Sequence, residues 1–135
     1  MPNYPGTANA TTTNTTPPLP QALYPGDSGL CFNAEQPAVP QASIAFALGS
    51  HGNDYTLQPV SVEGFFSGAP GAFEIDLQTS DTDADGMYAS ESTTITTVST
   101  NNTFRAEFPS VKAKFARLLL KSRANAVNLT GRIWR

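Results

Sequence analysis

Several residue types are scarce in this chain of 135 residues, and each scarcity excludes a class of protein. Cys31 is the only cysteine, so no internal disulfide can form and a disulfide-stabilised secreted scaffold is excluded. His51 is the only histidine, so no histidine cluster can bind a transition metal. No apolar run approaches about 18 residues, and the N-terminus lacks the basic and apolar regions of a signal peptide. We therefore expect neither a membrane span nor secretion.

Positive charge is absent from most of the chain. Residues 1–104 contain ten acidic residues and no Lys or Arg, a formal charge of −10, whereas residues 105–135 contain all eight basic residues and only Glu107, a charge of +7. Two interpretations remain open. Acidic and basic strands can lie side by side and neutralise each other, or the molecule can have an acidic side and a basic side suited to a charged partner.

Catalytic and cofactor motifs are also missing. The chain has no G-x-S-x-G elbow, no glycine-rich phosphate loop and no C-x-x-C pair. The segment from Asp81 through Asp83 and Asp85 to Gly86 matches the first half of a calcium loop, but Ser92 occupies the position of its bidentate glutamate. A solvated acidic turn explains this segment better, and cation binding there stays open. We expect no enzyme, no cofactor and no metal site. Nucleic-acid binding is disfavoured because the chain is acidic overall and its aromatic residues are needed for a core.

Residues 1–29 are rich in Thr, Asn and Pro and poor in core-forming side chains. This composition predicts an extended arm without a core of its own. Its large apolar residues would anchor the arm on a partner; they are Tyr4, Leu19, Leu23 and Tyr24.

From residue 30 to 135, short alternating runs separated by turns predict β-strands. The expected strands cover residues 43–48, 55–66, 72–79, 93–100, 104–108 and 127–133. The core predicted from this alternation consists of Ile44, Phe46, Leu57, Val62, Phe73, Ile75, Leu77, Phe104, Phe108, Phe115, Leu119, Val127, Leu129 and Ile133.

Residues 111–122 fit two structures. Apolar residues at helical spacing allow an amphipathic helix capped by Ser110, whereas alternation allows a strand with Phe115, Arg117 and Leu119 on one face. The strand is favoured because the neighbouring segments are β. The sequence therefore predicts an all-β protein, an antiparallel β-sandwich with jelly-roll topology over residues 30–135, preceded by the extended N-terminal arm.

Two parts of the sequence resemble known families. Residues 113–120, AKFARLLL, followed by a turn and by residues 127–134, VNLTGRIW, resemble the closing strand pair of galactose-binding-type jelly rolls. A Thr/Pro-rich arm ahead of a small β-domain with little charge is similar to small virion proteins of tailed bacteriophages, including capsid decoration (cement) proteins.

The resemblance implies a structural virion protein, a dimer or trimer on the capsid exterior that binds the major capsid protein and stabilises the shell. The alternative is a carbohydrate- or receptor-binding module of a phage tail or fibre, with Trp134, Tyr55 and Tyr88 as aromatic platforms. In addition to the arm residues, the expected partner-binding residues are Arg105, Lys112, Lys114, Lys121, Arg123, Arg132, Trp134 and Arg135.

Overall fold

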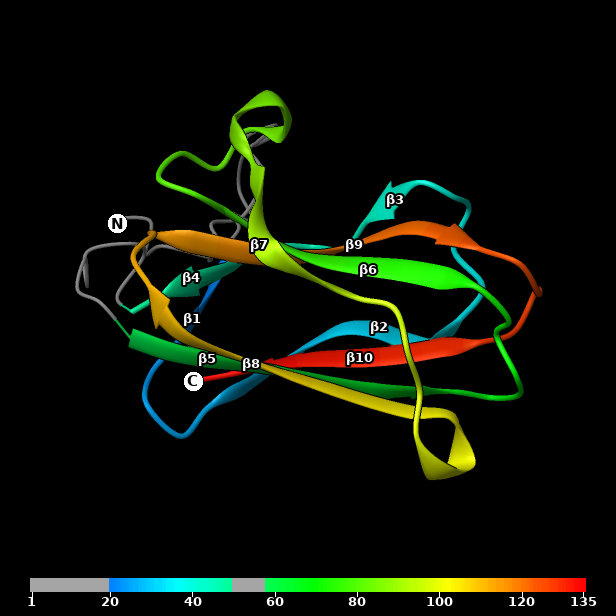
Figure 1. The fold of residues 1–135 in the computed structure, drawn as a ribbon. Helices are drawn as coiled ribbons and strands as arrows, with labels where there is room; N and C mark the ends of the chain where they lie inside the picture. The colour runs from blue at the N-terminus through cyan, green and yellow to red at the C-terminus, as the bar shows by residue number, and fades with distance from the viewer. Residues whose placement is uncertain (1–19, 50–57) are drawn as a thin grey trace, which may run out of the picture.

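The structure, a computed structural model, describes residues 20–49 and 58–135 and consists of two β-sheets packed face to face (Figure 1). The first sheet contains, in spatial order, β1 (Gln21–Leu23), β4 (Phe46–Leu48), β9 (Phe115–Arg123), β6 (Phe73–Ser80) and β7 (Ala89–Ile95), with β3 (Gln41–Ala42) also paired to β9. The second sheet contains β2 (Ser28–Glu35), β10 (Leu129–Trp134), β5 (Gln58–Phe66) and β8 (Thr103–Val111). Two short 3-10 helices, η1 (Asp85–Met87) and η2 (Thr100–Asn102), lie in connections.

The predicted all-β sandwich is confirmed. Residues 115–123 form a central strand of the first sheet, which decides the open choice between helix and strand for that part of the chain. The Thr-rich strand is displaced from its predicted position at 93–100 to Ala89–Ile95, because it pairs with β6 from Thr79 back to Ile75. Of the described residues, none belongs to a helix long and apolar enough to cross a membrane.

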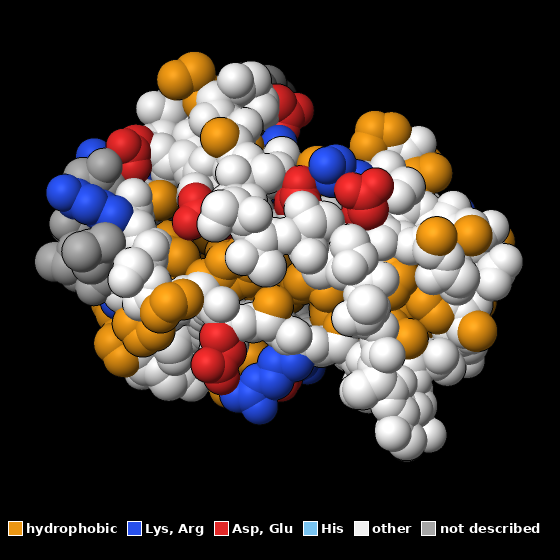
Figure 2. All heavy atoms as spheres, in the orientation of Figure 1, with side chains coloured by type: hydrophobic (Ala, Val, Ile, Leu, Met, Phe, Trp, Pro, Cys, Tyr) orange, Lys and Arg blue, Asp and Glu red, His pale blue; other side chains and the backbone are white. Residues whose placement is uncertain are grey.

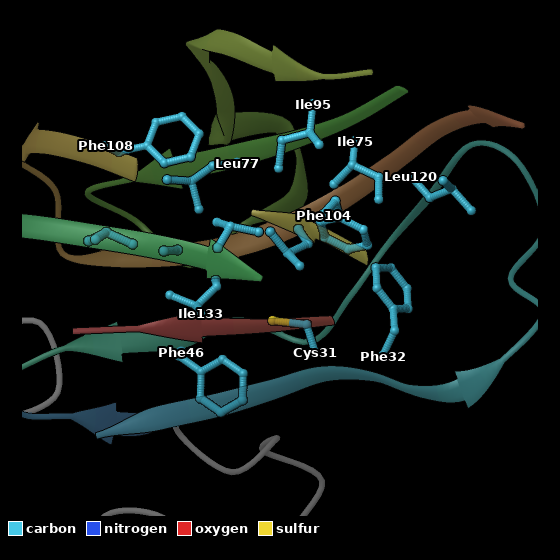
Figure 3. Close-up of a cluster of buried hydrophobic side chains, with 14 of the residues drawn as sticks. Cys31, Phe32, Phe46, Ile75, Leu77, Ile95, Phe104, Phe108, Leu120 and Ile133 are labelled. Carbon is cyan, nitrogen blue, oxygen red and sulfur yellow. The ribbon is translucent and has the colours of Figure 1, made fainter. Parts of the chain in front are cut away.

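The core lies between the two sheets, where side chains from both layers meet (Figure 3). Most of the predicted core residues in the described part of the chain are buried there: Phe46, Val62, Phe73, Ile75, Leu77, Phe104, Phe108, Leu129 and Ile133. Val127 is half-buried and packs against this cluster, and Leu57 lies outside the described residues. The prediction for Ile44 is wrong: 65% of this residue is exposed, because β4 begins only at Phe46.

The buried face of β9 is the opposite of the one we predicted. Leu118 and Leu120 are fully buried, whereas Phe115 and Leu119 are half-buried on the other face. The cause is the register with β6, which places Leu118 opposite Leu77 and Leu120 opposite Ile75. Large apolar residues occur on both faces of β9, and the pairing with β6 places the face of Leu118 and Leu120 in the core.

The sandwich begins earlier than the predicted boundary at residue 30. β1 pairs in parallel with β4 at the edge of the first sheet, and β2 starts at Ser28. Leu23, which we expected to anchor the arm on a partner, is fully buried within this chain. The segment before residue 30 therefore contributes an edge strand and a core side chain, and Tyr4 and Leu19 lie outside the described residues.

Candidate functional site

The outer surface of the second sheet brings together three of the predicted partner-binding residues, Arg105, Arg132 and Trp134. Because side chains alternate along a strand, the odd-numbered residues of β5 and of β8 up to Glu107 and the even-numbered residues of β10 face outward. We call this surface the four-stranded face; its residues are Ser61, Glu63, Phe65, Thr103, Arg105, Glu107, Thr130, Arg132 and Trp134.

A row of charged side chains crosses the middle of the four-stranded face. Glu63 on β5 lies opposite Arg132 on β10 and opposite Arg105 on β8. Directly opposed side chains on one sheet face have Cβ atoms about 4.5–5.5 Å apart, so Glu63 occupies the position between the two arginines in the strand pairing. With Glu107, which lies 3.4 Å from Arg105, β5, β8 and β10 place two Arg and two Glu on the face, and the formal charge of these three strands is zero.

Two aromatic side chains flank this row. Trp134 is 37% exposed and Phe65 is 48% exposed, so each presents a ring to solvent. The indole Nε1–H of Trp134 donates a hydrogen bond to Glu63 Oε1 over 2.6 Å, which fixes the indole beside the charged row. Large aromatic groups normally stabilise a fold by burial, so an ordered and exposed pair indicates a contact surface.

A depression of about 460 Å³ lies beside Phe65 on the same face. It is lined by Glu63, Gly64, Phe65, Ser99, Thr103, Phe104, Arg105, Thr130 and Arg132. Gly64 is needed here, because a Cβ at this position would lie 2.6 Å from the ring of Phe104 and would overlap the backbone of Thr130. A second depression, of about 470 Å³, lies further along β5 and β8 at Pro59 and Pro109.

A second group of the predicted residues lies at one end of the sandwich, at the left of Figure 1 where the chain ends. Arg135 donates from Nη1 to the Leu23 carbonyl over 2.8 Å, and its main chain is hydrogen-bonded to Gly26 and Asp27. The Leu48 amide donates to the Lys114 carbonyl over 2.8 Å, and Gly49 donates to Leu23. We call this region the terminal end; its residues are Leu23, Tyr24, Gly26, Asp27, Lys112, Lys114 and Arg135.

The remaining predicted basic residues lie elsewhere, on the second half of β9. Lys121 Nζ lies 3.7 Å from Glu74 and 3.6 Å from Asp76 on β6, and Arg123 donates a hydrogen bond to the carbonyl of Pro37. The basic segment therefore does not form a single patch. Figure 2 shows red and blue side chains next to each other on the face it presents.

The two oppositely charged parts of the sequence thus meet in adjacent strands. β6 is acidic and β9 is basic, and they pair along their length. This is the internal neutralisation that remained open in the sequence.

Arg117 holds the acidic turn against the first sheet. Its guanidinium is 2.6 Å from Asp85 Oδ1, donates to Gln78 Oε1 over 2.9 Å and lies 4.0 Å from the centre of the Tyr88 ring. Burial raises the pKa of Tyr88 and so does its hydrogen bond to Asp83. Tyr88 is therefore engaged within the turn, which removes it as a sugar platform.

The acidic side chains and the single cysteine do not add a second candidate site within the described residues. Within residues 20–49 and 58–135, no cluster of three His, Cys, Asp or Glu side chains could hold a metal ion, the acidic turn included. Burial raises the pKa of the Cys31 thiol to about 12, which keeps the thiol protonated. His51 and Tyr55 lie outside the described residues.

Trp134, Arg105 and Arg132 of this face were predicted from the sequence, whereas Glu63 and Phe65 were not. The alternation along β5 indicates the position of Phe65. Val60, Val62 and Phe66 have even numbers and face the core, whereas Phe65 has an odd number and faces outward. No protein-family model, curated protein or solved structure matches this chain significantly, so the assignment of function depends on its own residues.

Proposed function

We propose that the protein is a non-enzymatic structural component of a bacteriophage particle that binds the assembled capsid and stabilises it. In this proposal its sandwich has the jelly-roll form, and its contacts come from residues 1–19 and the terminal end. The partner is the major capsid protein, and the protein acts on the capsid exterior as a dimer or trimer.

The observation that supports this proposal is that residues 20–49 and 58–135 form a sandwich core in which Leu23 is already fully buried. β1 occupies the edge of the first sheet, and Arg135 hydrogen-bonds to the carbonyl of Leu23 at its end. In this proposal the sequence before β1 makes the capsid contacts, because it is rich in Thr and Pro and poor in core-forming side chains.

The terminal end offers a suitable contact surface. Tyr24 is 49% exposed on a turn that Asp27 closes by accepting a hydrogen bond from the Tyr24 amide over 2.9 Å. Lys112 and Lys114 follow β8 in the neighbouring turn, and an acidic capsid surface would orient the protein through them. Binding only to the assembled shell shifts the equilibrium towards assembly, and many repeated sites make modest contacts sufficient.

Co-sedimentation with purified capsids tests the proposal. Deleting residues 2–19 should leave the sandwich folded, by far-ultraviolet circular dichroism, and should weaken co-sedimentation. Attachment should also weaken as the salt concentration rises to about 0.1 M and beyond, where exposed charges are screened over ~10 Å. Unfolding of the truncated protein would contradict the role of the arm, and absence of the full-length chain from the capsid pellet would contradict the proposal itself.

The alternative, a carbohydrate- or receptor-binding module, is favoured by a different observation. The four-stranded face combines exposed aromatic rings, planar polar groups and a depression, and none of its residues belongs to the terminal end, although Trp134 directly precedes Arg135.

A further inference from the structure

We propose that the four-stranded face is a binding site for a neutral oligosaccharide that lies along β5. This inference does not depend on capsid attachment, because the four-stranded face shares no residue with the terminal end or with residues 1–19.

The exposed aromatic side chains of the four-stranded face can pack against sugar rings. A pyranose ring has C–H groups on its faces, and C–H groups pack favourably against the electron-rich face of an aromatic ring. Phe65 and Trp134 are the exposed aromatic residues of this face, and the hydrogen bond from Trp134 to Glu63 holds the indole in place. A platform that is already ordered loses little conformational entropy when a ligand binds.

The distance between the two platforms indicates the length of the ligand. Trp134 lies opposite Ser61 and Phe65 lies opposite Thr130, so the two aromatic positions are four residues apart along β5. At about 3.3 Å per residue, this separation is roughly 13 Å. It exceeds the length of one pyranose ring, so a chain of several sugars, but not a monosaccharide, can contact both rings.

The polar groups between the platforms match sugar hydroxyls. Glu63 is an acceptor, whereas Arg105 and Arg132 each carry five N–H donors. Their protein contacts are long: Arg105 lies 3.4 Å from Glu107, and Arg132 lies 3.4 Å from Ser28 Oγ. Because a hydroxyl both donates and accepts, a polyol can use the carboxylate and the guanidinium groups together.

The charge of the face favours a neutral ligand. Two Arg and two Glu give β5, β8 and β10 a formal charge of zero, so these three strands offer no net charge to attract an anionic or a cationic polymer. The depression of about 460 Å³ beside Phe65 is within the usual range for small-ligand pockets. Ser99, which follows β7, forms part of its wall.

Intrinsic fluorescence provides a direct measurement, because Trp134 is the only tryptophan of the sequence. We would titrate the full chain with maltohexaose, cellohexaose and chitohexaose, and with a heparin hexasaccharide as the charged comparison. At least one neutral probe should change the Trp134 emission saturably. Phe65→Ala and Arg132→Ala should each weaken that binding at least tenfold, about 1.4 kcal/mol. Ile44→Ala is the control, since this exposed apolar residue lies before β4 of the other sheet.

Three results would overturn the inference. One is no saturable change with any neutral probe up to about 10 mM, tenfold above a dissociation constant of about 1 mM. Another is binding that is confined to the heparin probe or that survives both substitutions. The third is loss of capsid co-sedimentation in folded Phe65→Ala, which would make the face a protein-docking surface.

Discussion

Asp76 provides the sharpest test of the packing described above. Its carboxylate is 2% exposed, although it lies on the outward face of β6. Oδ2 accepts a hydrogen bond from Ser90 and Oδ1 accepts one from Thr94, each over 2.7 Å, so the carboxylate ties the edge strand β7 to the sheet. Hydrogen bonds to a charged group contribute about 1.5–3 kcal/mol each. In the variant, water can hydrogen-bond to the hydroxyl of Ser90, because Ser90 is exposed, and can replace part of the lost stabilisation. We therefore take the lower value for both bonds.

Asp76→Ala should therefore lower the free energy of unfolding by about 3 kcal/mol. The ion pair with Lys121 adds little, because Lys121 also lies 3.7 Å from Glu74 and is itself largely solvated. With a urea dependence of about 2 kcal/mol per M, the unfolding midpoint should fall by about 1.5 M when followed by circular dichroism.

Glu74→Ala is the matched control, a carboxylate on the same strand face that is half-exposed and pairs with the same lysine. It should cost less than about 1 kcal/mol. If Asp76→Ala costs no more than Glu74→Ala, the two hydroxyl contacts do not hold β7 and the reasoning fails.

Three further predictions test the register, the buried thiol and the acidic turn. Leu118→Ala should lower the free energy of unfolding by about 2–5 kcal/mol and Leu119→Ala by much less, because only Leu118 leaves a core cavity; similar values from urea unfolding would contradict the register of β9. The pKa of Cys31 is raised from 9.0 to about 12 in the folded state, so the wild type should lose stability relative to Cys31→Ala as the pH rises from about 9 towards 12, by up to about 1.4 kcal/mol per pH unit. The difference in unfolding free energy should be constant below about pH 8, and a constant difference up to pH 11 would show that the thiol is not buried. Arg117→Met should speed amide hydrogen exchange in residues 82–88 and leave exchange in β10 unchanged, because Arg117 connects the turn to the sheet; equal exchange in both proteins would refute that connection.

The sequence alone determined the class of fold and much of the core. Strict alternation in Phe73, Ile75 and Leu77 assigns an inward face to β6 without any knowledge of its neighbours, because side chains of a strand alternate between its two faces. The same alternation placed Trp134 outside and Ile133 inside, which is why one corner of the candidate site could be predicted.

Tertiary structure decided everything that depends on which segments are neighbours. β9 has large apolar residues on both faces, and its register with β6 places Leu118 rather than Leu119 in the core. The joining of Glu63 with Arg105 and Arg132 on one face likewise requires the order β10-β5-β8. Composition allowed the charge split to create two charged sides, whereas the pairing of β6 with β9 brings Lys121 beside Glu74 and Asp76 and neutralises part of it. Local preferences act over a few residues, but strand order and register are set by the burial of whole faces, which no single segment encodes.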